Sequence, residues 1–395
     1  MTNFSNSQPV FIARCEDYNE DHLYLILKES FDTLGIDHTV FAGKNVLLKP
    51  NLVMAKNPDA AATTHPAFAR AAARLALDLG AASVTLADSP GGPFSEAYVS
   101  VVYSTCGMKL AAKDGLFALN SDFGFSEVHT SGVKLKTLNV INAFLKADVI
   151  VDLCRLKTHS LTGMSCAVKN LFGVVPGVEK FQMHSNFPEV GNFSEMLVDL
   201  AQYVTSEKTF IAVCDAIVSM EGNGPSHGMP KKTGMVLVSR SPFALDVIGE
   251  RIMFGAKGDN TAVIRHLDLA AGRGIMPRNW QEIEVVGETD YDVLEFAPPD
   301  TGAGYLLKNL PNFLGGKLVD TFSARPVINT KKCVGCGRCA DSCPKKTIRI
   351  GRRGEKGKKI AVIFRENCIK CYCCQELCPL GAVDTKQHFL IKLIH

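Results

Sequence analysis

Eight of the chain's fourteen cysteines lie in two short runs near the C-terminus. Each run has the pattern C-x2-C-x2-C-x3-C and is followed directly by proline. The first run is Cys333, Cys336, Cys339 and Cys343, and the second is Cys368, Cys371, Cys374 and Cys378. At this close spacing, one tight loop can present three thiolates to three iron corners of a single cube. The pattern therefore predicts two [4Fe–4S] clusters.

The fourth cysteine of each run is expected to bind the other cluster, because this exchange accompanies the same spacing in two-cluster bacterial ferredoxins. Pro344 and Pro379 lack a backbone donor and favour an extended conformation for the cysteine before them, which helps to direct that sulfur across to the second cube. One cluster would be bound by Cys333, Cys336, Cys339 and Cys378, and the other by Cys368, Cys371, Cys374 and Cys343.

A disulfide framework and a pair of zinc sites are the alternatives for these cysteines. Zinc sites usually pair two cysteines and leave a gap before two further ligands. They need neither three cysteines at strict x2 spacing nor the trailing proline. Cys373 could replace Cys374 as a ligand only by breaking the x2 spacing, so we leave Cys373 out of the ligand set.

A second group of candidates consists of polar residues that follow predicted strands in the rest of the chain. They are Lys49, Asn51, Asp88, Lys157, His159, Lys169, Asn170 and Glu221. Each alone could be a helix cap or a turn residue. Ligands bind outside the carboxyl ends of the strands in open α/β sheets, so the recurrence after four strands favours one shared crevice. The lysines would bind an anionic group or polarise a carbonyl, and His159, Asp88 or Glu221 would deliver protons.

Other chemistries lack their sequence signals. The stretch GNGPSHG (222–228) is one residue off the dinucleotide fingerprint and precedes a strand-like run rather than a helix. The phosphate-binding pattern G-x-x-x-x-G-K-[ST] and the nucleophile elbow G-x-S-x-G do not occur. Cys154, His159 and Cys166 could form a partial metal site, but buried cysteines more commonly pack as small hydrophobic side chains.

The elements that must position these residues alternate between strand and helix. Strands are expected at 10–13, 46–48, 83–87, 149–153, 210–214, 235–238 and 283–286, and helices at 22–34, 66–79, 97–102, 243–254 and 261–271. This alternation predicts an α/β domain built on a largely parallel sheet with flanking helices. The helix at 66–79 carries proline at its start and Gly80 just past its end, as helix termini favour.

The pattern changes after residue 290, where glycine and proline interrupt any sustained period. We therefore expect the α/β domain over 1–290, an irregular connection over 291–328, a small ferredoxin-like α+β domain over 329–385 and a tail over 386–395. Residues 347–350 and 360–364 should form a hairpin in the ferredoxin-like domain. Its tip carries Arg352, Arg353 and Lys356, which could be a solvated turn or a docking patch for an acidic electron carrier.

Part of the chain resembles an uncharacterised family, the domain of unknown function 362. The resemblance spans about residues 45–255 and rests on LLKPNLV (47–53), THPAFARAA (64–72), DSPGG (88–92), LKTHSLTGMSCAVKNLFGVVPG (156–177), EGNGP (221–225) and FALDVIGERIM (243–253). Members of the family often carry a ferredoxin-like tail, which CIKCYCCQELCP (368–379) resembles. The resemblance implies no particular reaction.

Composition sets the cellular context. An apolar content of 46% in 395 residues can supply a full hydrophobic core, and a net charge of +3 is too small to indicate nucleic-acid binding. The first nine residues lack the basic and apolar regions of a signal peptide, and no stretch approaches the roughly 20 apolar residues of a membrane helix. We expect a cytoplasmic protein of a reducing, anaerobic cell.

Two functions fit these observations. In the first, the protein is an iron–sulfur oxidoreductase, in which a donor such as a ferredoxin or flavodoxin supplies electrons through both clusters to a substrate or cofactor in the crevice. In the second, the α/β domain only binds a ligand or partner, and the clusters act as electron carrier or redox sensor. Two clusters form an electron relay that a simple binding module would not need, which favours the first.

Overall fold

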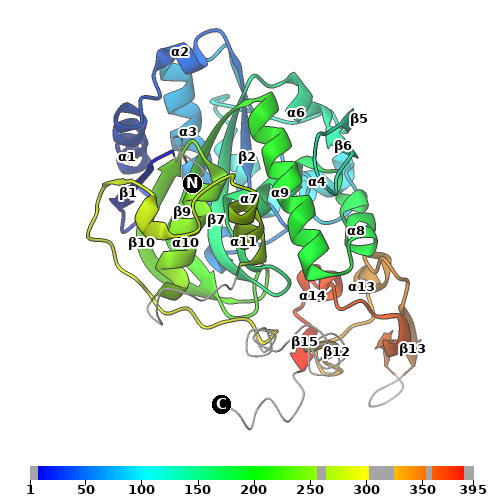
Figure 1. Cartoon of the computed structure of the whole chain (residues 1–395). Helices are drawn as coiled ribbons and strands as arrows, with labels where there is room; N and C mark the ends of the chain where they lie inside the picture. The colour runs from blue at the N-terminus through cyan, green and yellow to red at the C-terminus, as the bar shows by residue number, and fades with distance from the viewer. Residues whose placement is uncertain (1–7, 256–263, 302–323, 353–357, 387–395) are drawn as a thin grey trace.

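The computed structural model describes residues 8–255, 264–301, 324–352 and 358–386 (Figure 1). A main domain contains a nine-stranded sheet, and a smaller C-terminal module is formed by residues 324–352 and 358–386. The two are packed together at one end of the main domain, where α14 lies close to the lower ends of α8 and α9 in Figure 1.

The strands of the main sheet are β1 (Val10–Arg14), β2 (Asn45–Pro50), β3 (Ser83–Leu86), β4 (Ala118–Leu119), β7 (Val149–His159), β8 (Gly163–Ser165), β9 (Thr209–Glu221), β10 (Met229–Ser239) and β11 (Val285–Gly287). Their order is β11-β1-β10-β9-β7-β2-β3-β4, with β8 paired to β7. The run from β9 to β4 is parallel, whereas β10 is antiparallel to both of its neighbours. The expected α/β class with a largely parallel sheet is confirmed. Strands β5 (Phe125–His129) and β6 (Thr137–Ile141) form a separate hairpin.

Helices cover both faces of the sheet, which explains why the first halves of its central strands are mostly apolar. Neighbouring residues alternate between the two cores, so that Phe11 packs into one and Ile12 into the other. One core includes α1 (Glu20–Thr33), α3 (Pro66–Asp78), α4 (Glu96–Thr105) and α5 (Met108–Ala111), and the other includes α6 (Asn142–Lys146), α7 (Ala167–Asn170), α8 (Gly177–Asn186), α9 (Val190–Glu207), α10 (Pro242–Phe254) and α11 (Arg265–Gly272). Short helix α2 (His38–Phe41) follows α1.

Strands β7 and β9 are longer than their apolar patterns predict. The expected ends were residues 153 and 214, but the strands continue to His159 and Glu221. The extension contains charged residues that a buried strand tolerates only when they are paired. Arg155 and Asp215 are both buried and form an ion pair of 2.8 Å between Nη1 and Oδ2. Lys157 and His159 therefore lie within a strand rather than beyond its end.

The C-terminal module consists of two small antiparallel pairs and two short helices. The pairs are β12 (Arg325–Ile328) with β15 (Val383–Lys386) and β13 (Ile348–Arg352) with β14 (Lys359–Ile363), and the helices are α13 (Arg338–Asp341) and α14 (Cys373–Glu376). The expected hairpin is present as β13 and β14. Strand β12 falls in the stretch expected to be irregular, because its pairing partner lies far along the chain and leaves no local signal.

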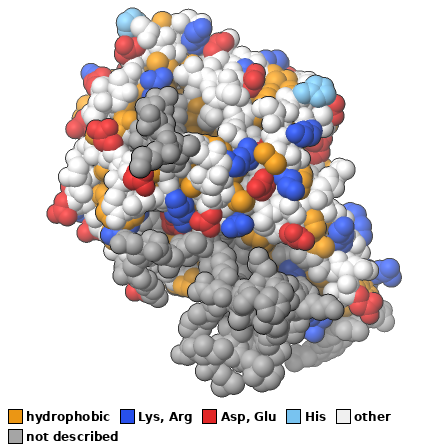
Figure 2. All heavy atoms as spheres, in the orientation of Figure 1, with side chains coloured by type: hydrophobic (Ala, Val, Ile, Leu, Met, Phe, Trp, Pro, Cys, Tyr) orange, Lys and Arg blue, Asp and Glu red, His pale blue; other side chains and the backbone are white. Residues whose placement is uncertain are grey.

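Several sequence expectations fall on residues that the structure does not cover. Residues 302–323 of the expected connection, Arg353 and Lys356 of the hairpin tip, and residues 387–395 of the expected tail lie outside the described residues. Within the described ranges, no helix has the length and apolarity to cross a membrane. On the face of the main domain in Figure 2, basic and acidic side chains are interspersed and no large patch of one sign is visible.

Candidate functional site

A cavity of about 60 Å³ lies between the main domain and the C-terminal module. Its wall on the main domain comes from the ends of β2 and β3, from α7 with the short 3-10 turn η2 (Leu171–Val174), and from α8. Its wall on the C-terminal module comes from α14 and the residue after it. The lining residues are Asn51, Val53, Asp88, Ser89, Gly91, Lys169, Asn170, Phe172, Gly173, Lys180, Phe181, His184, Cys373, Glu376 and Leu377. We call this the interdomain cavity.

Four of the eight predicted site residues line the interdomain cavity, namely Asn51, Asp88, Lys169 and Asn170. Lys49 and Lys157 lie directly behind the lining, each bonded to one of these residues. The structure therefore brings six of the eight together at the carboxyl ends of β2, β3 and β7.

His159 and Glu221 are not among the lining residues. His159 is buried, and its Nδ1 accepts the backbone N–H of Leu161 at 3.1 Å. Glu221 forms an ion pair of 2.8 Å with Lys231 on the neighbouring strand β10. Both lie at the extended tips of β7 and β9, beyond the edge where β2 and β3 stop.

A chain of hydrogen bonds joins the polar residues behind the cavity. Lys157 Nζ donates to Asn51 Oδ1 at 2.6 Å and to the Ala62 carbonyl at 2.6 Å. Asn51 Nδ2 donates to Asn170 Oδ1 at 2.7 Å, and Asn170 Nδ2 donates to Asp152 Oδ1 at 2.8 Å. Because each amide is held by a partner on both sides, its orientation toward the cavity is fixed.

A buried ion pair closes the base of the site. Lys49 Nζ lies 2.9 Å from Asp88 Oδ1, and Asp88 Oδ2 accepts the backbone N–H of Leu52 at 2.7 Å. Lys49 is fully buried and Asp88 is 3% exposed. A pair this deeply buried needs both partners, because removing one would leave an uncompensated charge.

Burial favours the uncharged forms of the ionisable groups around the cavity and shifts their pKa values accordingly. It lowers the pKa of Lys157 to about 7, against the attraction of Glu376, and that of Lys180 to about 7, against the attraction of Asp88. Burial also lowers the pKa of Lys169. In the opposite direction, burial raises the pKa of Asp152 to about 8, against the attraction of Lys49. Groups with a pKa near 7 can exchange protons at neutral pH.

The cysteines of the C-terminal module gather in two groups. Cys333, Cys336, Cys339 and Cys378 line one small cavity within the module. Burial raises the pKa of Cys374, and so do the charges of the nearby cysteines Cys371, Cys368, Cys339 and Cys343, of which Cys339 also belongs to the first group. The assignment of these cysteines to two separate clusters stays a prediction.

Backbone amides point at several of these sulfurs. Ala382 N–H donates to Cys378 Sγ at 3.1 Å, Thr347 N–H to Cys343 Sγ at 3.3 Å and Ala361 N–H to Cys333 Sγ at 3.4 Å. Such donors stabilise thiolates, which are the form that binds iron. The cysteine-lined cavity and these donors fit the binding of an iron–sulfur cluster.

Comparison with known protein families agrees with this geometry. A family described as a domain of unknown function (DUF362) matches residues 46–251, which is more than half of the chain. The chain belongs to the DUF362 family. A second family, described as a 4Fe-4S dicluster domain, matches residues 332–382. The C-terminal module is therefore a ferredoxin-type iron–sulfur domain of the kind that transfers electrons, and the resemblance expected from the sequence is confirmed.

Individual relatives match each part of this DUF362 protein. A thylakoid-associated protein from Synechocystis is 30% identical over 247 residues, which cover 60% of this chain and 72% of the relative. An uncharacterized ferredoxin from Methanocaldococcus jannaschii is 40% identical over 60 residues, which cover 15% of this chain and 75% of the relative. Among solved structures, the lactate racemase apoprotein from Thermoanaerobacterium thermosaccharolyticum has a TM-score of 0.37 at 15% identity, covering 60% of this chain and 55% of that one.

Five residues of the DUF362 protein's site were missed by the sequence analysis: Asp152, Lys180, His184, Cys373 and Glu376. Asp152 carried a usable signal, because a lone carboxylate in an apolar strand must have a partner. Lys180 and His184 follow η2 on α8, outside any strand end. Cys373 and Glu376 belong to the other module, and nothing in the sequence indicates how the two modules pack.

Replacing Asp152 by asparagine should remove a pH dependence of stability. Because the pKa of Asp152 is raised from 3.8 to about 8, the folded protein holds a proton that the unfolded chain has released. The free energy of unfolding should therefore fall as pH rises from about 5 to about 7, by at most ~1.4 kcal/mol per pH unit from this group. The Asp152→Asn variant should lack this contribution in urea denaturation under anaerobic conditions.

The exposed Asp32→Asn variant is the control for that measurement, and its slope should match the wild type. Buried His184, with its pKa lowered to about 3, makes the opposite contribution below pH 6.5, but it is common to all three proteins. The lowered pKa values of Lys157 and Lys180 make stability rise with pH mainly above the measured window. Equal slopes in Asp152→Asn and wild type would contradict the protonated state of Asp152.

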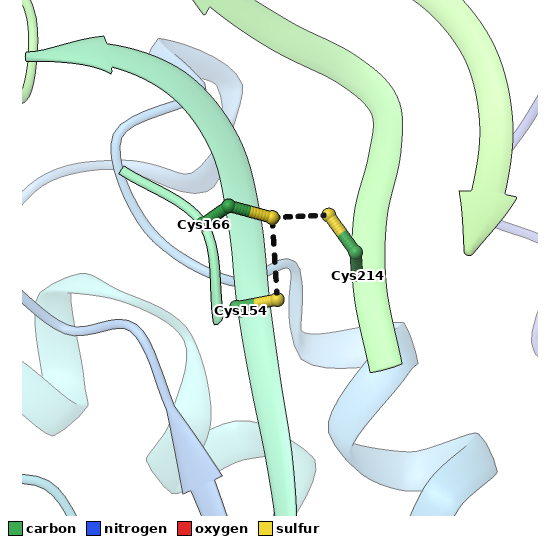
Figure 3. A group of neighbouring side chains, drawn as sticks. All are labelled: Cys154, Cys166 and Cys214. Carbon is green, nitrogen blue, oxygen red and sulfur yellow. Dashed lines mark hydrogen bonds between the residues drawn. The ribbon is translucent and has the colours of Figure 1, made fainter. Parts of the chain in front are cut away.

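A third group of cysteines lies in the core of the DUF362 domain (Figure 3). Cys166 Sγ is 3.9 Å from Cys154 Sγ and 3.6 Å from Cys214 Sγ, and all three residues are buried. The structure therefore places Cys214, rather than His159, beside Cys154 and Cys166. Burial raises the pKa of the Cys154 and Cys166 thiols, whereas the pKa of Cys214 is lowered to about 6 despite its burial, because it is hydrogen-bonded to both of those thiols. These properties match the expectation that Cys154 and Cys166 pack as small hydrophobic side chains.

Proposed function

We propose that the protein is an iron–sulfur oxidoreductase that passes electrons from a donor protein to a substrate or cofactor in the interdomain cavity. Two [4Fe–4S] clusters in the C-terminal module would supply single electrons. One set of ligands would be Cys333, Cys336, Cys339 and Cys378, and the other Cys368, Cys371, Cys374 and Cys343. The observation that carries the proposal is the position of α14, which contains Cys374 and also forms one wall of the cavity.

The shared helix supports electron delivery because it places a ligand-binding site and a candidate substrate site next to one another. Cys373 and Glu376 line the cavity on either side of Cys374 in the sequence. Leu377 also reaches across, since a Cβ built on Gly91 would lie 2.5 Å from Leu377 Cδ2. The second cavity within the module, lined by the other cysteine group, would lie further along the relay.

Proton delivery can be assigned to residues of the DUF362 domain. Organic reductions usually need one proton for each electron. Lys169 and Lys180 line the cavity, and burial lowers the pKa of both lysines. The pKa of Lys180, lowered to about 7, suits it to donate a proton near neutral pH. The two lysines replace His159 and Glu221 as the proposed proton donors, because those two residues lie away from the cavity.

The donor is proposed to be a small acidic carrier such as a ferredoxin or flavodoxin. Lys345, Lys346, Arg349, Lys358 and Lys359 are exposed residues of the C-terminal module. Opposite charge on a carrier would raise its rate of encounter with this surface.

The proposed function predicts that electrons leave the protein through the interdomain cavity. The Val53→Phe variant would narrow this cavity without changing either cysteine run. The wild-type protein, purified anaerobically and reduced with dithionite, should be reoxidised by the small molecules that copurify with it. Reoxidation of Val53→Phe by the same extract, followed by visible absorbance, should be slower by roughly tenfold or more.

The matched control is Val101→Phe, since Val101 is exposed on α4 at a distance from the cavity lining. Its reoxidation should equal that of the wild type, and mass spectrometry of the extract would identify the acceptor. Equal rates in wild type and Val53→Phe would overturn the proposal. An extract that contains no acceptor, together with reoxidation by a carrier protein alone, would favour the carrier or sensor function.

A further inference from the structure

Lys169 is a buried cation without a polar partner among the residues that the structure covers. The residue is 9% exposed and its side chain lines the interdomain cavity. Its Nζ lies 4.6 Å from the centre of the Phe172 ring and 6.0 Å from that of Phe193. The neighbouring lysines differ, because Lys49 is paired with Asp88 and Lys157 donates to Asn51.

A buried ammonium group that lacks hydrogen-bond acceptors is costly, and a ring face compensates only part of that cost. Three acceptors would be needed to satisfy the three N–H groups of Lys169. Because the side chain lines the cavity, acceptors for these N–H groups could be supplied by a molecule bound there.

At about pH 6, where lysines with a pKa of about 7 are protonated, the side-chain charges around the cavity are unbalanced. Lys169 and Lys180 line it, and Lys157 lies behind Asn51. Asp88 is already paired with Lys49, and burial keeps Asp152 protonated at neutral pH because its pKa is raised to about 8. Glu376 is therefore the remaining carboxylate of the lining that can oppose these lysines.

Glu376 acts on the lysines from the other module. Its attraction is the largest electrostatic contribution opposing the effect of burial on the pKa of both Lys157 and Lys169. It is only partly buried, and it makes no ion pair within 4 Å in the described part of the chain. Glu376 is therefore a nearby carboxylate that attracts these lysines without an ion pair to them.

Other polar side chains of the lining are already fixed by protein contacts or are neutral. The side-chain amides of Asn51 and Asn170 are fixed by the hydrogen bonds that join them. His184 stacks on Phe193 at 4.4 Å between ring centres, and burial lowers its pKa to about 3, so that it is neutral. A cavity of about 60 Å³ leaves little room beyond a single small group.

We propose that the part of the interdomain cavity beside Lys169 and Lys180 is a subsite for a small oxyanion, namely the carboxylate or phosphate group of the substrate. That the anion belongs to a substrate rests on the proposed function. The binding of the anion itself does not depend on electron transfer. The bound anion would accept hydrogen bonds from Lys169 Nζ and replace Glu376 as the nearest negative charge.

Two substitutions with opposite expected effects test the subsite. The Lys169→Met variant keeps the length of the side chain but removes its charge, and should weaken oxyanion binding by roughly tenfold or more. The Glu376→Gln variant removes the competing carboxylate and should strengthen binding severalfold. Loss of folding cannot produce tighter binding, so the second variant keeps the test informative if the first is unstable.

Binding would be measured by calorimetry on the anaerobic protein with its clusters, at about pH 6, where lysines with a pKa of about 7 are protonated. Acetate and inorganic phosphate are the two probes, and the tighter of the two identifies the class of oxyanion. Lys109→Met is the control, because Lys109 is exposed on α5 and bonded to Ser100. Its affinities should match those of the wild type.

The inference would be overturned by equal affinity in Lys169→Met and wild type, or by no binding of either probe. Oxyanion affinity that falls from Glu376→Gln to wild type to Lys169→Met would support the subsite. If Val53→Phe is then reoxidised as fast as the wild type, the subsite is retained and the oxidoreductase is rejected. Equal oxyanion affinity in Lys169→Met and wild type, together with slower reoxidation of Val53→Phe, would reject the subsite and support the oxidoreductase.

Discussion

Replacing Cys339 or Cys374 by serine is expected to remove one cluster in each case, lowering iron and acid-labile sulfide from about eight of each per chain to about four. Serine offers a hard oxygen where iron–sulfur clusters take soft thiolate ligands. Cys339 belongs to one of the two cysteine groups of the C-terminal module, and Cys374 belongs to the other. Iron and sulfide would be determined chemically on protein prepared without oxygen, with electron paramagnetic resonance of the reduced state.

Cys373→Ser is the matched control, because Cys373 is adjacent to Cys374 and is also buried, yet its side chain lines the interdomain cavity. Its iron content should stay close to that of the wild type. Equal loss of iron in Cys373→Ser would show that the ligand set is wrong. Stoichiometric zinc without sulfide in the wild type would refute the cluster assignment altogether.

Replacing Gly173 by alanine should be severely destabilising. A Cβ at this position would lie 1.9 Å from Asp88 Oδ1 and 2.4 Å from Lys49 Nζ. The new methyl group would have to separate the buried ion pair or displace the backbone of η2. Breaking a buried pair costs about 3–5 kcal/mol, so the free energy of unfolding should fall by roughly that amount. Denaturant titration of the anaerobic protein, followed by circular dichroism, would measure the change.

Gly191→Ala provides the comparison, since Gly191 lies in α9 and a Cβ there would contact nothing within 4 Å. Alanine at an open helix position should be neutral or stabilising by up to about 1 kcal/mol. Similar stability of Gly173→Ala and Gly191→Ala would mean that the Lys49–Asp88 pair is not held as tightly as the structure indicates.

The layered fold could be predicted from the sequence because its strands and helices have strong local patterns. The helix at 66–79 illustrates this: Pro66 is its first residue, and Gly80 beyond its end has a positive φ of 90°. The ends of β7 and β9 could not be predicted. Their charged extensions are stable as strands only because partners on other strands, such as Asp215 for Arg155, satisfy them.

The unpredicted strand ends also explain which of the candidate site residues lie at the cavity. Asn51 and Asp88, just after β2 and β3, lie at the cavity because those strands stop at the edge of the sheet. His159 and Glu221 lie away from the cavity because their strands continue past that edge. Part of the electrostatic environment, namely Glu376, comes from a module whose packing depends on surface shape rather than on any sequence pattern.

The position of α14 has a consequence for the maturation of this protein. This four-residue helix begins at Cys373 and includes Cys374, and it is too short to be stable alone. On the proposed ligand assignment, its conformation in the mature protein would depend on the cluster bound by Cys374, so the interdomain cavity would be completed only after iron and sulfide are inserted. Oxidative loss of that cluster would then dismantle the binding site together with the relay, so that damage by oxygen would switch off ligand capture and electron flow in a single event.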